Sequence, residues 1–265
     1  MKIETIKTID IPSLSHLQPE GWVDIIPVFE YYSKSPFCFP IKVTVEDKII
    51  GLGCIVIHHD VAWLAHIIVD SAYRCNGIGQ KITRALIENA EQNDCTTMYL
   101  IATELGEFVY RKVGFVTETE YLFHTNVVKR DWVISDSIRQ YEEKYMEQVR
   151  VLDKAVSGED RMMHLEEHLE NCLVYYKNDT VDEYYMPTFG EGLIIAGTET
   201  AGIELLKLHL KDNDRVVIPQ ENHTARKFLE ETGEGEIKAI KRMRLGKERE
   251  VQFSNIYNRI GGNVG

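Results

Sequence analysis

The chain has 265 residues, of which 44% are hydrophobic and 27% charged, a balance typical of a soluble protein with a packed core. Its formal net charge of −12 opposes the phosphate contacts that a nucleic-acid-binding protein needs. No apolar stretch is long enough to span a bilayer, and the segment after Met1 lacks the apolar run of a signal peptide. We therefore expect neither a nucleic-acid partner nor a membrane partner.

The cysteines indicate the compartment. They are odd in number and lack C-x-x-C spacing, which is typical of free thiols in a reducing environment. We therefore expect a cytoplasmic protein. The five cysteines are Cys38, Cys54, Cys75, Cys95 and Cys172.

In chain order, the first hundred residues predict an edge strand, a helical opening and an antiparallel meander. The apolar positions between Trp22 and Tyr32 have mixed helical spacing that Pro27 interrupts, whereas alternating or continuous apolar runs indicate strands. Turns are expected around Asp47 and His59. The predicted strands cover residues 3–6, 41–46, 49–57, 62–69 and 99–103.

The most informative segment follows the strand over 62–69. It reads Arg74-x-x-Gly77-x-Gly79 and continues into an amphipathic helix from Ile78, with Ile78, Ile82, Ala85, Leu86 and Ala90 on one face. A glycine-rich turn at a helix start directs several N–H groups to one place that the helix dipole makes positive, which suits a pyrophosphate. The dinucleotide fingerprint does not fit because there is no third glycine, and no Gly-Lys-Ser/Thr indicates a P-loop.

A second motif follows the strand over 99–103. Residues 108–115 end in Tyr110-x-Lys112-x-Gly114-Phe115. The two motifs, in this order and on these elements, resemble the GNAT N-acetyltransferase superfamily. The resemblance implies an α/β (mixed α+β) chain of tandem acyl-CoA N-acyltransferase folds, each with a central mixed, mostly antiparallel sheet flanked by helices.

The resemblance also implies an acetyl-CoA site between the strands ending near Val69 and Ala102. Strand backbone is expected to hydrogen-bond the pantetheine arm, and the turn is expected to hold the pyrophosphate. Asn76 suits a left-handed position, and Thr103 departs from the asparagine of many family members. The implied cofactor-binding residues are Ile67, Ile68, Val69, Arg74, Cys75, Asn76, Gly77, Ile78, Gly79, Gln80 and Thr103.

The implied catalytic residue is Tyr110, whose phenol is placed to protonate the departing CoA thiolate. The oxyanion is expected on a backbone N–H, that of Val69. Candidates for the base are Glu104 and His66, with a water chain as the alternative. Cys75 at a helix start could be a nucleophile, but no local histidine activates it, so we expect direct acetyl transfer. We expect no metal cofactor.

The second half predicts a weaker copy of the first. A bridging helix is expected over 131–152, and the same strand–turn–helix–strand–helix order recurs between Gly192 and Gly233. Leu229 stands where the first half has its tyrosine, so this copy is not expected to be catalytic. His164 and His168 are expected to be solvated. The predicted domains are a GNAT domain over 1–130, a linker over 131–155 and a degenerate GNAT-like domain over 156–265.

The leading functional hypothesis is an acetyl-CoA-dependent N-acetyltransferase for a small-molecule or amino-acid-like amine. Trp22, Asp24, Tyr31 and Tyr32 are expected on the acceptor side. The alternative is a non-catalytic acyl-CoA-binding regulatory or scaffold protein, and transfer of a longer acyl group stays open. A homodimer is the default oligomer.

Overall fold

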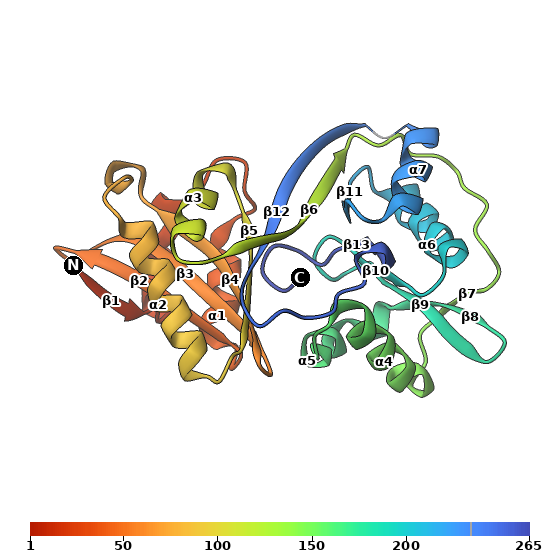
Figure 1. The fold of residues 1–265 in the computed structure, drawn as a ribbon, viewed down its shortest axis with the longest axis horizontal. Helices are drawn as coiled ribbons and strands as arrows, with labels where there is room; N and C mark the ends of the chain where they lie inside the picture. The colour runs from red at the N-terminus through yellow and green to blue at the C-terminus, as the bar shows by residue number, and fades with distance from the viewer. Residues whose placement is uncertain (234) are drawn as a thin grey trace. The chain divides into compact units, whose positions relative to one another are not determined.

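The computed structural model describes residues 1–233 and 235–265, which form two compact units (Figure 1). Unit 1 comprises Met1–Glu118, Arg242–Glu248 and Gly262–Val264, and unit 2 comprises Thr119–Lys241, Arg249–Gly261 and Gly265. The predicted division into residues 1–130, 131–155 and 156–265 stays a prediction. Both units are discontinuous, since residues 242–248 and 262–264 belong to unit 1.

Unit 1 is built on a mixed sheet in the order β1-β2-β3-β4-β5. β1 to β4 pair antiparallel with their neighbours, whereas β4 and β5 are parallel. Residues 242–246, the end of β12, continue the sheet beside β5. The predicted mixed, mostly antiparallel sheet is therefore confirmed. Its strands are β1 (Lys2–Thr5), β2 (Cys38–Val45), β3 (Lys48–His58), β4 (Val61–Val69) and β5 (Thr97–Ala102).

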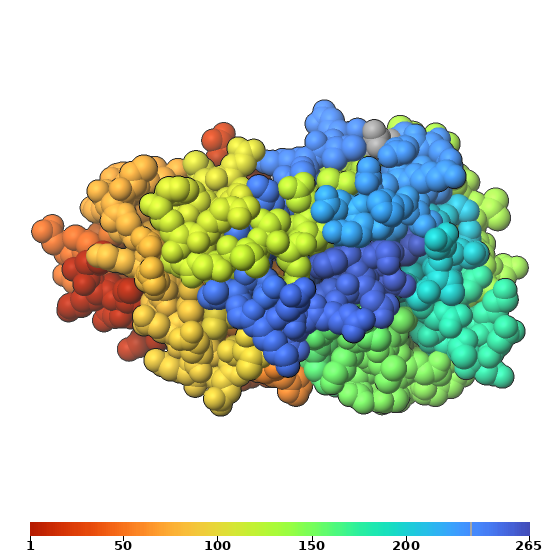
Figure 2. All heavy atoms as spheres, viewed as in Figure 1, coloured from red at the N-terminus to blue at the C-terminus, as the bar shows by residue number. Residues whose placement is uncertain are grey.

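Helices cover both faces of this sheet. The predicted apolar face of α2 is confirmed, because Ile78, Ile82 and Leu86 are buried against the face that carries Ile41 and Val43. Figure 2 shows α2 and α3 side by side on this face, in gold and yellow-green. The helical segments of unit 1 are η1 (Thr8–Leu17), α1 (Ile25–Lys34), η2 (Ser71–Tyr73), α2 (Ile78–Gln92) and α3 (Glu104–Lys112).

Helix α1 lies against the opposite face, where buried Tyr32 is close to Cys54. The expectation that Pro27 interrupts this helix was wrong. Pro27 is the third residue of α1, and the N–H groups of the first helical turn have no intrahelical partner to lose. Asp24 begins the helix by accepting a hydrogen bond from the Ile26 N–H, 2.9 Å.

Strand β4 contains a bulge where it leaves β5. The β4–β5 ladder is paired only as far as Leu64 and Leu100. Just beyond, the register against β3 shifts between Leu52–Ile68 and Cys54–Ala65, so two residues of β4 face one residue of β3. One of the two, His66, has φ +49°, a left-handed conformation that is uncommon outside glycine. The strands therefore separate at a defined place.

Unit 2 has a five-stranded sheet in the order β13-β10-β9-β8-β7 and an antiparallel β6–β11 pair. The helix expected over 131–152 was wrong, since β7 occupies part of that range and α4 begins only at Met146. The elements are β6 (Val116–Thr125), β7 (Ile138–Gln140), η3 (Glu143–Tyr145), α4 (Met146–Ser157), α5 (Met162–Leu165), η4 (Glu166–Asn171), β8 (Leu173–Lys177), β9 (Thr180–Met186), β10 (Leu193–Ala196), α6 (Glu199–Asp212), β11 (Val216–Pro219), α7 (His223–Thr232), β12 (Glu236–Gly246), η5 (Phe253–Asn255) and β13 (Ile256–Asn258).

The internal repeat that the sequence predicts is present in the backbone. Thr103 caps α3 by accepting from Gly106, and Asn222 caps α7 by accepting from Ala225. Gly114 and Gly233, each eleven residues after the cap, have φ of +105° and +101°. The same start and stop signals therefore define α3 and α7.

Within residues 1–233 and 235–265, no helix combines the length and apolarity needed to cross a membrane.

The two histidines of the segment after α4 are not both solvated as expected. The expectation was wrong for His164, which is buried. It was incomplete for His168, whose ring stacks on Phe189 with ring centroids 4.1 Å apart.

Candidate acyl-transfer site

The turn between β4 and α2 has its own internal support. The Arg74 Nε donates to the Val69 carbonyl, 3.1 Å, and so folds back on the end of β4. The Asn76 side-chain amide donates to the carbonyls of Tyr73 and Arg74, 3.3 and 3.1 Å. Asn76 was predicted to be left-handed, but this conformation belongs to Cys75, φ +63°, and Gly77, φ +74°. The turn is therefore held in shape before any ligand arrives.

The two glycines leave room at the start of α2. A Cβ on Gly77 would meet no atom within 4 Å, and a Cβ on Gly79 would meet only a Val69 methyl at 3.8 Å. Gly77 is the N-cap of α2, so the unpaired N–H groups of the first turn open onto this free space. Such a place suits an anion by its charge.

The predicted pantetheine-binding residues line the separation between β4 and β5. Ile68 pairs with Leu52 of β3, whereas Ile67 and Val69 pack toward the α2 side of the sheet. Beyond Leu64 the β4 ladder with β5 has ended, so an extended ligand can lie along this stretch as an added strand. The role of these residues in binding pantetheine stays a prediction.

Tyr110 is buried on α3. Its ring packs over Gly106, where a Cβ would lie 2.7 Å from it, and edge-on to Phe115 at 6.2 Å. No hydrogen bond joins its hydroxyl to any residue that the structure describes. Burial raises the pKa of Tyr110 to about 12, above the value near 10 of an ordinary phenol. Tyr110 therefore stays protonated at neutral pH.

Thr103 and Glu104 stand at the start of α3. The Thr103 hydroxyl accepts from the Gly106 N–H, 3.3 Å, so part of its hydrogen-bonding capacity is used as a helix cap. Glu104 follows in the first helical turn, where a carboxylate is stabilised by the helix dipole. This position explains Glu104 without a catalytic role.

His66 lies in an aromatic setting on the α1 side of the sheet. Its ring is edge-on to Trp22, Phe29 and Tyr32, at 5.9, 5.9 and 5.6 Å between centroids. The Tyr32 hydroxyl is 3.0 Å from the His66 Nδ1, and the Asn263 side-chain nitrogen is 3.0 Å from the same hydroxyl. Burial lowers the pKa of His66 to about 4, so the ring is neutral at physiological pH.

Of the expected acceptor-side residues, the structure brings Trp22 and Tyr32 to His66. Tyr31 neighbours Tyr32, with centroids 6.2 Å apart, and is 46% exposed. Asp24 serves as the cap of α1. Sequence reasoning missed Phe29 and Asn263. Asn263 carries no motif, and its pairing with Tyr32 spans 231 positions, so no local signal could have found it.

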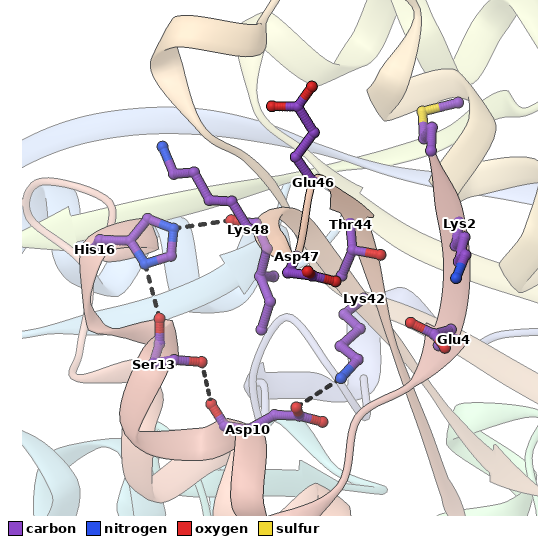
Figure 3. A pocket seen from close by; sticks show the side chains of 12 residues that line it. Lys2, Glu4, Asp10, Ser13, His16, Lys42, Thr44, Glu46, Asp47 and Lys48 are labelled. Atoms are coloured by element: carbon purple, nitrogen blue, oxygen red, sulfur yellow. Dashed lines mark hydrogen bonds and ion pairs between the residues drawn. The ribbon is translucent and has the colours of Figure 1, made fainter.

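A separate polar hollow of about 670 Å³ lies between η1 and the strands β1 to β3 (Figure 3). Several of its charged and polar groups are already engaged. The Lys42 Nζ pairs with Asp10 at 2.6 Å, and His16 is hydrogen-bonded to the carbonyls of Ser13 and Ile49. None of the predicted site residues lines it. This hollow is therefore not the acyl-transfer site.

The comparison with protein families decides the identity of unit 1. Residues 3–115 match the model of the acetyltransferase (GNAT) family. This segment is a GNAT acetyltransferase domain. It includes both predicted motifs, the β4 bulge and Tyr110. No curated protein matches the chain.

Solved structures extend the likeness to nearly all of the chain. A candidate acetyltransferase from Pyrococcus horikoshii is 21% identical with a TM-score of 0.82, over 100% of this chain and 95% of that one. An N-acetyltransferase from Kribbella flavida is 14% identical with a TM-score of 0.60, over 92% and 70%. A GNAT-family acetyltransferase from Colwellia psychrerythraea is 10% identical with a TM-score of 0.55, over 93% and 100%. The predicted acyl-CoA N-acyltransferase fold is confirmed.

Unit 2 fills with its own strand the place that the GNAT domain leaves open. In the repeat, β10 and β11 correspond to β4 and β5. β13 pairs antiparallel with β10 through Ile194–Asn258, and it also bonds β11. The Val217 N–H donates to the Asn258 side chain, 2.8 Å, and the Arg259 N–H donates to the Val217 carbonyl, 3.1 Å. β13 therefore lies between β10 and β11, which correspond to the two strands that separate in unit 1.

The start of α6 is closed in the same way. A Cβ on Gly202 would lie 2.3 Å from the Tyr257 ring, so an aromatic side chain covers the first turn of the helix. The buried Glu183 carboxylate accepts from the Thr198 N–H and hydroxyl, 3.1 and 2.7 Å, at the helix cap. An internal carboxylate thus occupies the anion position at the start of α6.

Proposed function

We propose that unit 1 transfers the acetyl group of acetyl-CoA directly to the amine of a small-molecule or amino-acid-like acceptor. The observation that carries this proposal is the combination, in one GNAT domain, of an open β4–β5 separation, a glycine turn at the start of α2 and a buried phenol whose hydroxyl has no hydrogen bond to the residues that the structure describes. Each of the three serves one part of acetyl-CoA: the pantetheine arm, the pyrophosphate and the sulfur.

In the proposed reaction the neutral amine nitrogen attacks the thioester carbonyl carbon. A C–N bond forms, the C–S bond breaks, and the electron pair of that bond leaves on sulfur. Tyr110 gives its phenolic proton to the thiolate and is reprotonated from solvent, and the surplus proton of the amine passes to water. With a pKa of about 12, Tyr110 is a weaker acid than the sequence suggested. Burial also disfavours the anionic thiolate, so the acidities of the phenol and the thiol remain matched for proton transfer.

Tyr110→Phe tests the proposal. The expected result is a loss of kcat of about 100-fold or more, as for removal of a general acid, with acetyl-CoA affinity unchanged. Because the Tyr110 hydroxyl has no hydrogen bond within the described residues, its removal leaves packing intact and the melting temperature close to that of wild type. Thiol release with a panel of amines measures kcat, and calorimetry measures affinity.

One result argues against an enzyme, and another argues against the role of Tyr110. If wild type binds acetyl-CoA but none of the tested amines causes thiol release, the chain is an acyl-CoA-binding protein without turnover. If Tyr110→Phe keeps full kcat, another group protonates the thiolate. In either case unit 2 is not expected to bind acetyl-CoA, because β13 and Tyr257 fill the corresponding place.

The remaining proposals concern partners and compartment. We propose that no metal takes part, that the acceptor is a small molecule rather than a nucleic acid or membrane, and that any oligomer is a homodimer. The five cysteines are all unpaired thiols, four of them buried, which suits the reducing cytoplasm.

A further inference from the structure

A chain of three side chains ends at the point where β4 leaves β5. It runs from Asn263 through the Tyr32 hydroxyl to the His66 imidazole, with 3.0 Å at each step. His66 is one of the two residues of the β4 bulge, and its left-handed backbone turns its side chain to the α1 side of the sheet. The chain therefore leads to the edge of the proposed acyl site.

Among the described residues, the Tyr32 hydroxyl has two side-chain hydrogen-bond neighbours, the Asn263 amide nitrogen and the His66 Nδ1. The amide nitrogen has no acceptor lone pair, so it donates to the Tyr32 oxygen. The His66 Nδ1 is then the acceptor that these neighbours offer to the single proton of Tyr32. A neutral imidazole carries one proton, and with Nδ1 as acceptor that proton is on Nε2.

The surroundings keep the imidazole neutral. Aromatic edges from Trp22, Phe29 and Tyr32 surround it, and no carboxylate pairs with it among the residues that the structure describes. Nδ1 is engaged by a neutral hydroxyl, which cannot stabilise an imidazolium as a carboxylate does. A proton acceptor for an amine needs an unprotonated nitrogen, but with Nδ1 engaged by the Tyr32 proton the remaining ring nitrogen, Nε2, carries the N–H.

We propose that His66 is a catalytic hydrogen-bond donor to the oxygen of the thioester carbonyl, and that Tyr32 and Asn263 are positioning residues that hold its proton on Nε2. This inference rests on the proposed acyl transfer. As the amine nitrogen bonds to the carbonyl carbon, negative charge grows on the carbonyl oxygen, and the Nε2–H stabilises it. When the C–S bond breaks the charge returns to form the amide, and His66 ends with the proton it began with.

The role differs from the general base that the sequence left open for His66. A neutral donor stabilises charge without transferring a proton, as the donors of an oxyanion hole do. It supplements the backbone N–H expected for the same oxygen. The strained position of His66 is then part of the site, since a regular strand would direct this side chain elsewhere.

Nitrogen NMR on the full chain, labelled at histidine, tests the proton positions without any substrate. The expected spectrum at pH 7 shows the His66 Nε2 protonated and Nδ1 unprotonated, assigned by the loss of its signals in His66→Phe. A proton on Nδ1 overturns the inference. Asn263→Asp is expected to reverse the pattern, because a carboxylate accepts the Tyr32 proton and the Tyr32 oxygen then accepts from His66 Nδ1–H.

Kinetics test the role. His66→Phe removes the donor and is expected to lower kcat about 100- to 1,000-fold with little change in the KM for acetyl-CoA, the size of effect seen on losing one oxyanion donor. His66→Gln retains an N–H donor and is expected to recover part of the rate. Asn263→Asp is expected to lose at least 10-fold in kcat, whereas Asn93→Asp, the same change at an exposed site on unit 1, is expected to lose nothing.

The outcomes separate this inference from the proposed function. An active wild type with full kcat in His66→Phe overturns only the role of His66. A wild type that transfers acetyl to no amine overturns both. If His66→Phe does not fold, Asn263→Asp decides, because Asn263 lies outside the regular elements: full kcat together with an unchanged histidine spectrum overturns the relay.

Discussion

Replacing Gly77 with alanine separates the folding role of this glycine from its binding role. Gly77 has φ +74° and an unobstructed Cβ position, so alanine brings backbone strain of about 1–2 kcal/mol but no clash. At about 2–4 °C per kcal/mol for a domain of this size, the expected fall in melting temperature is roughly 2–8 °C. The new methyl lies in the space at the start of α2 where the pyrophosphate is expected.

The matched control is Gly21→Ala. Gly21 has φ +75° and also meets nothing within 4 Å, so alanine brings the same strain at a place without a phosphate role. Gly79→Ala is the complementary variant. Its Cβ makes only an ordinary contact with Val69 and its φ is not positive, so no loss of stability is expected, but the methyl again enters the phosphate space.

Thermal shift with acetyl-CoA is the assay. Ligand at about 100 times its Kd stabilises a protein by about 2.7 kcal/mol, so wild type and Gly21→Ala are expected to gain roughly 5–10 °C. Gly77→Ala and Gly79→Ala are expected to gain much less, with affinity lowered at least 10-fold by calorimetry. Affinity within twofold of wild type in both variants would refute the placement of the pyrophosphate.

Three further predictions concern stability. Asp153→Ala leaves the buried Arg161 without its 2.8 Å partner, so urea denaturation is expected to show unit 2 destabilised by about 3–5 kcal/mol, and a loss below 1 kcal/mol would contradict this. The pKa of His66 is about 4 when folded and near 6.5 when unfolded, so the unfolded state binds the proton first and stability falls as pH drops from about 6.5 to 4. His66→Phe is expected to remove that part of the pH dependence, measured as unfolding free energy against pH. Gly202→Ala is expected to destabilise unit 2 by about 1–3 kcal/mol, because the new methyl clashes with the Tyr257 ring. In a Tyr257→Ala background the same change is expected to cost no stability. An equal loss with and without the Tyr257 ring would show that the ring does not fill the space.

Local sequence signals predicted the elements that position the cofactor. The spacing of Ile78, Ile82 and Leu86 predicted α2 because a helix face repeats every three to four residues, and the structure buries all three. The glycine pair predicted the turn, because a left-handed cap needs glycine. Its other left-handed residue, Cys75, was not predicted, since no side-chain chemistry favours that conformation there.

Non-local pairing explains what the sequence could not predict. The apolar residues across 131–152 keep helical spacing, but antiparallel pairing with β8 makes Ile138–Gln140 a strand. Strand β13 is three residues long and has no period of its own. Asn263 joins the site by a contact that depends on the whole of unit 1 being folded.

The discontinuity of unit 1 has a consequence for how the protein is made. A ribosome releases residues 1–118 first, but residues 242–248 and 262–264 of the same unit emerge only after nearly all of unit 2. Until then the edge of β5 lacks its β12 neighbour, and an uncovered strand edge invites pairing with other chains. A nascent chain can therefore form the glycine turn early, but it completes the Tyr32–Asn263 contact only once synthesis has passed residue 263. Acyl-transfer competence would then arrive late, after the opportunity for misassembly has passed.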